Sequence, residues 1–355
     1  MPKKRLRIAQ VAPLWTSVPP KKYGGTELVV SALSEGLVKR GHQVTLFASG
    51  DSQTSAKLVS ITPKNLIERG VPFSNQLLPL ASLNVAFQRA KEFDVIHTHV
   101  DTFELFFPGL TDTPALHTIH SDVSCPAPSE ASKLTLETYT RYAKNNFVAI
   151  SSNQRKTSAA PLNWVKTIHH GLNLENYLFH PTAQDHVVWT ARISPKKGAL
   201  EAILAAGQAK RKLRLAGPIM TKENRNYFEA QISPLLKEHN AEYVGEISQA
   251  QKSAFLGTAS ALLYPASWEE PFGLVIIEAM ACGTPVVAFN RGAASELIVD
   301  GKTGFLVRTL SEMVRAIAKV HTLDRAACRQ HIEQHFSADR MVTEYEEVYY
   351  QLLKK

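Results

Sequence analysis

Short apolar runs rich in β-branched residues alternate along the chain with longer segments in which apolar residues recur every three to four positions. The first pattern is typical of buried strands and the second of amphipathic helices. Their regular alternation predicts an α/β fold in which parallel sheets are covered by helices on both faces. In the first half, the predicted strands are residues 7–13, 42–48, 94–100, 115–121 and 147–152, and the predicted helices are residues 26–41 and 130–144.

The pattern begins again after residues 169–186, a polar stretch rich in turn-forming residues. We therefore predict two Rossmann-like parallel-sheet domains, residues 1–172 and 173–340, that face a cleft lined by the carboxyl ends of their strands. Residues 338–355 are predicted to form an amphipathic helix, which either packs back on the first domain or caps the second. In the second half, the predicted strands are residues 186–194, 212–218, 241–247, 261–267, 285–290 and 304–307, and the predicted helices are residues 196–209, 222–238, 249–257, 273–282 and 309–320.

Composition and charge narrow the class of protein. Hydrophobic residues make up 44% of the 355 positions and charged residues 20%, as in ordinary globular proteins. Residues 1–170 hold 19 Lys and Arg against 12 Asp and Glu, a net charge of +7, whereas the rest holds 21 against 20. A basic first half suits an anionic membrane surface, an acidic substrate or simply a solvated surface. Because zinc-finger spacing and RNA-recognition motifs are absent, nucleic acid is not expected as a partner.

Other bulk features bear on location and cofactors. The sequence has no uninterrupted apolar run of roughly 18–20 residues, and its three cysteines are widely scattered, which suits a reducing compartment. We predict a cytoplasmic protein, with peripheral contact on the inner membrane face left open. The G-x-G-x-x-G fingerprint of dinucleotide sites is absent, so neither a nicotinamide nor a flavin cofactor is expected.

The first chemical motif is the pair Gly24-Gly25 before a predicted helix. Without Cβ atoms at these positions, a phosphate could approach backbone N–H groups at the helix N-terminus. A plain loop capped by Thr26 explains the same residues equally well.

The second motif follows the first strand of the second half. Arg192 and Lys197 stand five positions apart across a turn, and a forked cation beside a point-like one suits a diphosphate. Lys197 is preferred to Lys196 because it precedes Gly198. An ordinary surface turn is the competing interpretation.

Several histidines stand at the ends of predicted strands. His120 lies at the end of the predicted strand 115–121, and His170 ends the strand-like stretch 165–170. The alternation of side chains places His97 and His99 on the same face of the predicted strand 94–100. A metal site at His97 and His99 would need a third ligand such as Asp101 or His120. Nothing in the sequence requires one, so we predict no metal.

Two acids, Glu270 and Glu278, lie within the stretch WEEPFGLVIIEAMACG. Pro271 suits the first turn of a helix, so we expect a helix from about this residue, with Glu278 about two turns inside it. The carboxylates would then lie about 12 Å apart along the helix, too far for a retaining glycosidase pair at about 5 Å. They are better interpreted as contacts to two parts of one extended ligand, with a phosphate at the free N–H groups of residues 272–274.

Residues 270–288, EPFGLVIIEAMACGTPVVA, closely resemble the E-x7-E signature of retaining nucleotide-sugar glycosyltransferases of family four (group 1), which have the GT-B fold. The Gly-Gly loop, His170-Gly171, Arg192 with Lys197-Gly198, and GAASELIVDGKTGFLV at 292–307 follow in the family's order. The resemblance extends over essentially the whole chain. It implies transfer of a hexose from a nucleoside-diphosphate sugar to an acceptor hydroxyl with retention of configuration, without a cofactor or metal.

The resemblance also implies roles for single residues. Glu270 would contact the sugar hydroxyls near the reaction centre, Glu278 the ribose, and His120 the sugar and acceptor. Arg192 and Lys197 would hold the diphosphate and stabilise its charge as it leaves. The donor-binding set it implies is completed by Gly24, Gly25, His170, Gly245, Phe272, Gly273 and Leu274.

The resemblance leaves some points open. GAASE at 292–296 departs from the usual Gly-Gly-x-Pro-Glu, which leaves the role of Glu296 in doubt. A uridine diphosphate sugar is favoured weakly over a guanosine one, and the acceptor is a sugar, a lipid-linked sugar or a small metabolite. A sugar-nucleotide epimerase of similar architecture and a non-catalytic nucleotide-sugar binding protein are the alternative functions.

Overall fold

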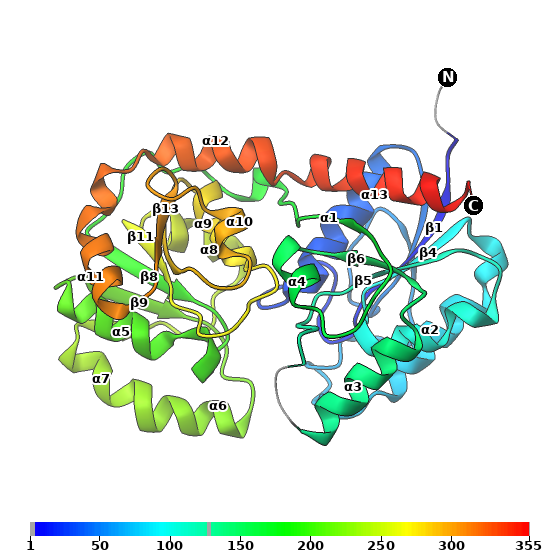
Figure 1. Ribbon diagram of the computed structural model, residues 1–355, viewed down its shortest axis with the longest axis horizontal. Helices are drawn as coiled ribbons and strands as arrows, with labels where there is room; N and C mark the ends of the chain where they lie inside the picture. The colour runs from blue at the N-terminus through cyan, green and yellow to red at the C-terminus, as the bar shows by residue number, and fades with distance from the viewer. Residues whose placement is uncertain (1–3, 126–128, 355) are drawn as a thin grey trace. The chain divides into compact units, whose positions relative to one another are not determined.

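The computed structural model describes residues 4–125 and 129–354, which divide into two compact units (Figure 1). Unit 1 takes the described residues of Met1–Gly171 and Ala338–Lys355, and unit 2 is Leu172–Ser337. Each unit contains one parallel sheet with helices packed on it, which confirms the predicted α/β class.

The sheet of unit 1 has seven strands in the order β3-β2-β1-β4-β5-β6-β7. Its order reverses between β1 and β4, where a doubly wound sheet has its ligand-binding switch point. The strands are β1 (Arg7–Val11), β2 (Gln43–Phe47), β3 (Lys57–Val59), β4 (Val95–Thr98), β5 (Ala115–Thr118), β6 (Asn146–Ala149) and β7 (Trp164–Thr167). The helices are α1 (Gly25–Lys39), α2 (Leu77–Gln88), α3 (Glu130–Arg141), the short α4 (Ser152–Thr157) and α13 (Ala338–Leu352).

Alternation along the strands assigns opposite faces of this sheet to different partners. Ala9 and Val11 of β1 belong to an apolar cluster with Leu83 and Phe87 of α2. The residue between them, Gln10, points the other way and contacts Tyr349 of α13. One face of the sheet is therefore apolar beneath α2, and the other carries polar groups beneath α13.

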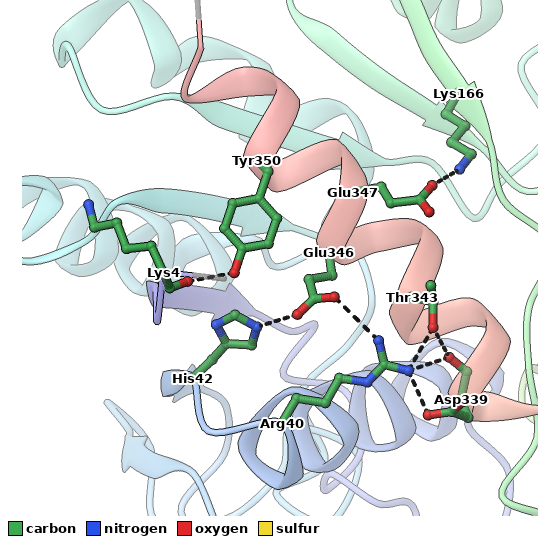
Figure 2. Close-up of polar contacts among 9 residues, drawn as sticks. All are labelled: Lys4, Arg40, His42, Lys166, Asp339, Thr343, Glu346, Glu347 and Tyr350. Atoms are coloured by element: carbon green, nitrogen blue, oxygen red, sulfur yellow. Dashed lines mark hydrogen bonds and ion pairs between the residues drawn. The ribbon is translucent and has the colours of Figure 1, made fainter. Parts of the chain in front are cut away.

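The C-terminal helix α13 belongs to unit 1, although the chain reaches it only after passing through unit 2. Figure 2 shows polar contacts along the helix: Arg40 donates to Asp339 Oδ1 (2.6 Å) and Thr343 Oγ1 (2.7 Å), and His42 bonds to Glu346 (3.0 Å). Lys166 pairs with Glu347 and the Tyr350 hydroxyl donates to the Lys4 carbonyl in the same view. The inner side of the helix is buried. Helix α13 is thus fixed to unit 1 from both sides.

Unit 2 has a six-stranded sheet in the order β10-β9-β8-β11-β12-β13. Helices α5 and α11 pack on each other and on the strands, and α8, α9 and α12 form a second packed group. The strands are β8 (His186–Thr190), β9 (Lys212–Ala216), β10 (Ala241–Tyr243), β11 (Ala261–Tyr264), β12 (Val286–Phe289) and β13 (Gly304–Val307). The helices are α5 (Ala199–Gln208), α6 (Lys222–Tyr227), α7 (Ser233–Glu238), α8 (Gln249–Gly257), α9 (Leu274–Ala281), α10 (Ala294–Leu297), α11 (Leu310–Lys319) and α12 (Arg325–His335).

Two predicted helices differ from those observed. The helix expected over 222–238 is interrupted by a π-helical segment, Phe228–Ile232, ahead of Pro234, which has no N–H for the regular helical hydrogen bond. The helix expected from 196 begins at Ala199, because Gly198 adopts a left-handed conformation (φ 76°) that ends the preceding 3₁₀ turn. No helix in residues 4–125 and 129–354 is both long and apolar enough to span a membrane.

Candidate functional site

Lys197 and Glu270, 73 positions apart in the sequence, form an ion pair in unit 2. The Glu270 Oε2 atom also accepts a hydrogen bond from the Trp268 indole N–H (2.9 Å), and Lys197 Nζ lies 4.9 Å from the centre of the Trp268 ring. The carbonyl of Lys197 accepts from Trp189 Nε1 (3.0 Å), which fixes the turn after β8. Lys197, rather than the exposed Lys196, is therefore the lysine that faces Glu270.

Glu278, on α9, is held in a similar way. Its Oε1 atom accepts hydrogen bonds from the Tyr177 hydroxyl (2.8 Å) and from Lys252 Nζ (2.9 Å). The side chain of Glu278 is 3% exposed, and that of Lys252 is 18% exposed. A carboxylate buried to this extent requires a partner of opposite charge, which Lys252 provides.

The two carboxylates share one arrangement. Each is anchored through a single oxygen by one lysine and one aromatic N–H or O–H donor. The second oxygen of each, Glu270 Oε1 and Glu278 Oε2, has no hydrogen-bond partner among the described residues. An ionised carboxylate oxygen accepts hydrogen bonds only, so both are suited to the hydroxyl groups of a ligand.

Helix α9 begins between these two acids, but later than predicted. Its first residue is Leu274 and its N-cap is Gly273, whose φ of 95° is costly for residues with a Cβ atom. Glu270 therefore lies in the loop before the helix and Glu278 only about one turn inside it, so the rise along a helix axis does not give their separation. Gly273 has no side chain to cap the helix, and the partial positive charge of the first N–H groups remains available to an anion.

The loop of Glu270 is fixed by the segment that contains GAASE. The Ala293 N–H donates to the Glu270 carbonyl (3.0 Å), and the Gly292 N–H donates to Glu269 Oε2 (2.9 Å). A Cβ atom on Gly292 would clash with the backbone of Glu270. This segment therefore has a structural function in placing Glu270, and Glu296 lies one turn further along, in α10.

Arg192 and Gly245 lie just beyond the carboxyl ends of two strands of the unit 2 sheet, β8 and β10. Arg192 follows β8, and the Nε atom of its guanidinium is buried without a hydrogen-bond partner among the described residues. Gly245 follows β10, and its carbonyl accepts from the N–H of Gly217, which follows β9 (2.9 Å). Ligands of open parallel sheets bind at this end of the strands.

In unit 1, Gly24 is the N-cap of α1 and Gly25 its first residue. A Cβ atom on Gly24 would lie 2.7 Å from both the Pro20 Cβ and the Thr16 Oγ1 atoms, so the loop before α1 closes tightly onto this glycine. Thr26, considered as a cap from the sequence, is instead inside the helix.

His120 and His170 are brought together in unit 1, where their rings stack with centres 5.2 Å apart. Nε2 of His120 is 3.0 Å from Nδ1 of His99, and the backbone N–H of His120 donates to Asp101 Oδ1 (3.3 Å). Burial lowers the pKa of His120 to about 3 and lowers the pKa of His170 well below its usual value. Both rings are thus neutral near pH 7. Among residues 4–125 and 129–354, no group of three or more His, Cys, Asp or Glu side chains is arranged to hold a metal ion.

The sequence did not indicate the residues that anchor the two acids. Trp268 stands inside the motif, but its indole N–H could not be assigned to Glu270 from spacing alone. Tyr177 and Lys252 are 101 and 26 positions from Glu278, and only the fold brings them to it. The presence of a buried acid on an apolar helix was the one signal that such partners were required.

Comparisons with known proteins bear on the family and the fold of the chain. Residues 23–176 match the family model described as Glycosyltransferase Family 4, and residues 175–335 match the one described as Glycosyl transferases group 1. The chain therefore has the fold and domain content of a glycosyltransferase. Together, the two matches extend over residues 23–335 and support a group 1 glycosyltransferase.

Relatives and solved structures extend over nearly the whole chain. A phosphatidyl-myo-inositol mannosyltransferase of Mycobacterium leprae is 24% identical over 351 residues, 92% of this chain and 89% of that protein. A sucrose-phosphate synthase from Thermosynechococcus elongatus superposes with a TM-score of 0.79 at 23% identity, over 99% of this chain and 100% of that one. The Anabaena protein HepE, solved with UDP-glucose, gives 0.76 at 20% identity, over 98% and 100%. These likenesses show the GT-B fold.

Proposed function

We propose that the protein transfers a hexose from a nucleoside-diphosphate sugar to an acceptor hydroxyl with retention of the anomeric configuration, as a family-four enzyme. The observation that carries this proposal is the pair of carboxylates Glu270 and Glu278, each anchored through one oxygen, on either side of an uncapped helix N-terminus. The two carboxylates can accept hydrogen bonds from hydroxyl groups, and the helix N-terminus can bind an anion. Together they suit a ligand with sugar, phosphate and ribose parts.

Charge balance in the site supports a diphosphate between the two acids. Lys197 neutralises Glu270, and Lys252 neutralises Glu278. Arg192 remains as a cation whose buried Nε atom has no partner among the described residues, and the α9 N-terminus adds partial positive charge. In the proposed mode, Arg192 and Lys197 hold the phosphates, Gly273 and Leu274 donate backbone N–H groups beside Phe272, and Gly245 adjoins the base.

The proposed mechanism requires no covalent enzyme intermediate. The bond from the anomeric carbon to the diphosphate oxygen breaks, and its electron pair leaves with the nucleoside diphosphate, stabilised by Arg192, Lys197 and the helix N–H groups. The acceptor oxygen forms its bond to the same face of the sugar and gives its proton to an oxygen of the leaving phosphate. Glu270 binds sugar hydroxyls during this step. For His120, His170, Gly24 and Gly25 of unit 1, the proposed roles are those that the family resemblance implies.

A thermal-shift screen tests the donor part of the proposal. UDP, GDP and ADP, their glucose and mannose conjugates, and NAD are compared at millimolar concentration, with UDP-sugars expected to stabilise most. A ligand at one hundred times its dissociation constant adds about 2.7 kcal/mol to the free energy of unfolding. We expect Arg192→Ala to remove the shift. Absence of a shift for all nucleotides would contradict the proposal, and a shift for NAD alone would favour a redox enzyme.

The acceptor is proposed by class only: a sugar, a lipid-linked sugar or a small metabolite. The mycobacterial relative is named for transfer to a phosphatidylinositol, and the first 170 residues carry a net charge of +7, which favours peripheral contact with an anionic membrane. Co-sedimentation with vesicles containing an anionic lipid, compared with neutral vesicles, tests this contact. If the protein binds neither the anionic nor the neutral vesicles, a water-soluble acceptor would be favoured.

A further inference from the structure

A continuous chain of buried hydrogen bonds leads from His120 to helix α13 in unit 1. Its first part runs from His120 Nε2 to His99 Nδ1 (3.0 Å) and from His99 Nε2 to Gln10 Oε1 (2.9 Å). The amide nitrogen of Gln10 then donates to the Tyr349 hydroxyl (2.9 Å). Gln10 and Tyr349 are fully buried and His99 is 1% exposed, so water does not compete for these bonds.

The second part of the chain continues from Tyr349. Its hydroxyl is 2.7 Å from His97 Nδ1, and His97 Nε2 is 2.8 Å from Thr118 Oγ1. Thr118 Oγ1 in turn lies 2.9 Å from the hydroxyl of Tyr345, one turn before Tyr349 on α13. The register of the strands explains why these side chains meet. Gln10 of β1 pairs with His97 of β4, and the alternation of side chains along each strand turns both towards α13.

The donors and acceptors in this chain determine the tautomer of His120. Burial lowers the pKa of His97, His99 and His120, so each ring carries a single ring proton near pH 7. Gln10 Oε1 can only accept, so the proton of His99 is on Nε2 and its Nδ1 is bare. His120 must therefore donate from Nε2, which leaves its own Nδ1 without a proton. Among the described residues, this Nδ1 has no hydrogen-bond partner.

The Gln10 amide, placed with its nitrogen towards the Tyr349 hydroxyl, sets the direction of the other half of the chain. Its amide N–H occupies the Tyr349 oxygen as a donor, and the single proton of the Tyr349 hydroxyl is then directed to His97 Nδ1. His97 donates from Nε2 to Thr118. Rotation of the amide by 180° would require every bond from His120 to Thr118 to reverse. The polar contacts of Arg40, His42, Lys166 and Tyr350 keep α13, and with it Tyr349, in place (Figure 2).

We propose that Gln10 and Tyr349 are positioning residues that hold His120 as its Nε2–H tautomer, so that the bare Nδ1 atom accepts a hydrogen bond from a hydroxyl of the bound sugar or acceptor. The role of this nitrogen in transfer rests on the proposed function, but the tautomer itself does not. Through this chain of hydrogen bonds, the C-terminal helix determines which ring nitrogen of His120 carries the proton.

The test compares Tyr349→Phe with Tyr345→Phe. Both substitutions remove one fully buried hydroxyl from α13 without changing the size of the ring, so their general effects on packing are matched. Tyr349→Phe removes both the acceptor for Gln10 and the donor to His97, whereas Tyr345→Phe removes a bond only at the far end, at Thr118. His120→Gln identifies the His120 signals in nitrogen-15 NMR spectra of the histidine rings.

In the wild-type protein and in Tyr345→Phe, we expect His120 to show a protonated Nε2 and a bare Nδ1. In Tyr349→Phe, both tautomers should appear, and kcat should fall about three- to tenfold, the factor that a buried hydrogen bond contributes. Rate changes in Tyr345→Phe should stay within about twofold. The KM for the donor should change less than kcat, because the alteration concerns the state of one nitrogen rather than the binding surface.

A wild-type spectrum with the opposite tautomer or a mixture would overturn the proposal, even if Tyr349→Phe did not fold. An unchanged tautomer in folded Tyr349→Phe would also overturn it. If the tautomer behaves as expected but no donor is turned over by the wild-type protein, the positioning of His120 stands and the proposed function fails. The two failures are therefore distinguishable.

Discussion

Lys196 and Lys197 are neighbours in the sequence but have different surroundings, and this difference gives the most direct residue-scale prediction. The side chain of Lys197 is 14% exposed and pairs with Glu270, whereas Lys196 is exposed. We expect Lys197→Ala to lower kcat by about 10²–10³-fold, since it removes a preorganised charge beside the leaving diphosphate. Steady-state kinetics with the donor identified by thermal shift measure the effect.

Lys196→Ala is the matched control for this experiment. It removes the same charge one position away, so long-range effects on the potential around Glu270 are nearly equal. We expect it to keep kcat within about twofold. Equal losses in the two variants would contradict a specific role for Lys197 and would indicate a general effect of charge.

Glu27, in the first turn of α1, provides a prediction about pH. Burial raises its pKa from 4.5 to about 7, although hydrogen bonds to its own backbone and to Thr16 oppose this change. A carboxyl with a raised pKa binds more protons in the folded state, so its contribution to stability is full below about pH 4.5 and is lost as the pH rises to about 7. Gln resembles the protonated acid and does not titrate.

We therefore expect the free energy of unfolding of Glu27→Gln, relative to the wild type, to increase between pH 4.5 and pH 7.5 by roughly 3 kcal/mol. Urea unfolding at several pH values measures this difference. Other groups, such as Asp101, whose pKa burial also raises to about 7, titrate in both proteins and cancel. A difference that stays constant with pH would show that Glu27 titrates normally.

At the scale of elements, the contact between α1 and α13 depends on a glycine inside a helix. A Cβ atom on Gly36 would lie 2.5 Å from Val342 Cγ2. Alanine is normally favoured over glycine within a helix by about 1 kcal/mol. Here we expect Gly36→Ala to destabilise unit 1 by about 1–3 kcal/mol, because overpacking forces the two helices apart.

The double variant Gly36→Ala with Val342→Ala isolates this contact. Val342→Ala removes the clashing methyl groups, so in that background the alanine at 36 should be neutral or stabilising by up to about 1 kcal/mol. Chemical unfolding of the four proteins in the cycle gives the coupling energy. Additive effects would mean that the helices do not meet at these residues.

Helices and strands whose apolar residues recur at a regular spacing were predictable from the sequence. Those without such a spacing were not. Helix α8 was predicted at 249–257 from its pattern of apolar residues, and it is found there. The structure adds a capping box of Ser248 and Gln251 at its start. Helix α2 was not predicted: Pro79 stands in its first turn, and apolar residues occur around its whole circumference. Helix α12 buries only Cys328 and Ile332, which is too few positions to define a face.

The same limit applies to the candidate site. The positions of Arg192, Lys197, Glu270 and Glu278 were predictable because their local motifs are distinctive. The partners that anchor them, among them Tyr177, come from distant parts of the chain, and no local pattern relates those parts. The apolar pattern predicted the start of α9 at 273, within one residue of the observed Leu274. Pro271, an acceptable first helical residue, suggested a start three residues too early, whereas the left-handed Gly273 sets the observed one.

At the scale of the whole molecule, the chain order and the structural units do not coincide. Unit 2 is one continuous segment, Leu172–Ser337, whereas unit 1 is completed only by α13 at the far end of the chain. Six apolar or aromatic side chains of α13 are buried, namely Met341, Val342, Tyr345, Val348, Tyr349 and Leu352. At roughly 1.5–3 kcal/mol each, their burial is comparable to the entire stability of a typical domain.

We therefore expect a fragment of residues 172–337 to fold alone with a cooperative thermal transition, and a fragment of residues 1–171 not to do so. Without α13, the polar groups of Gln10 and His97 lose their hydrogen-bond partner, and the apolar residues around them are exposed to water. We expect this loss to exceed the free energy of unfolding of unit 1. Addition of a peptide of residues 338–355 should restore a cooperative transition to the 1–171 fragment in a concentration-dependent way. Circular dichroism melting curves of the two fragments, with and without the peptide, measure this. A cooperative transition of the 1–171 fragment alone, unaffected by the peptide, would show that α13 is dispensable for folding, and any role it has would then be confined to the position of Tyr349.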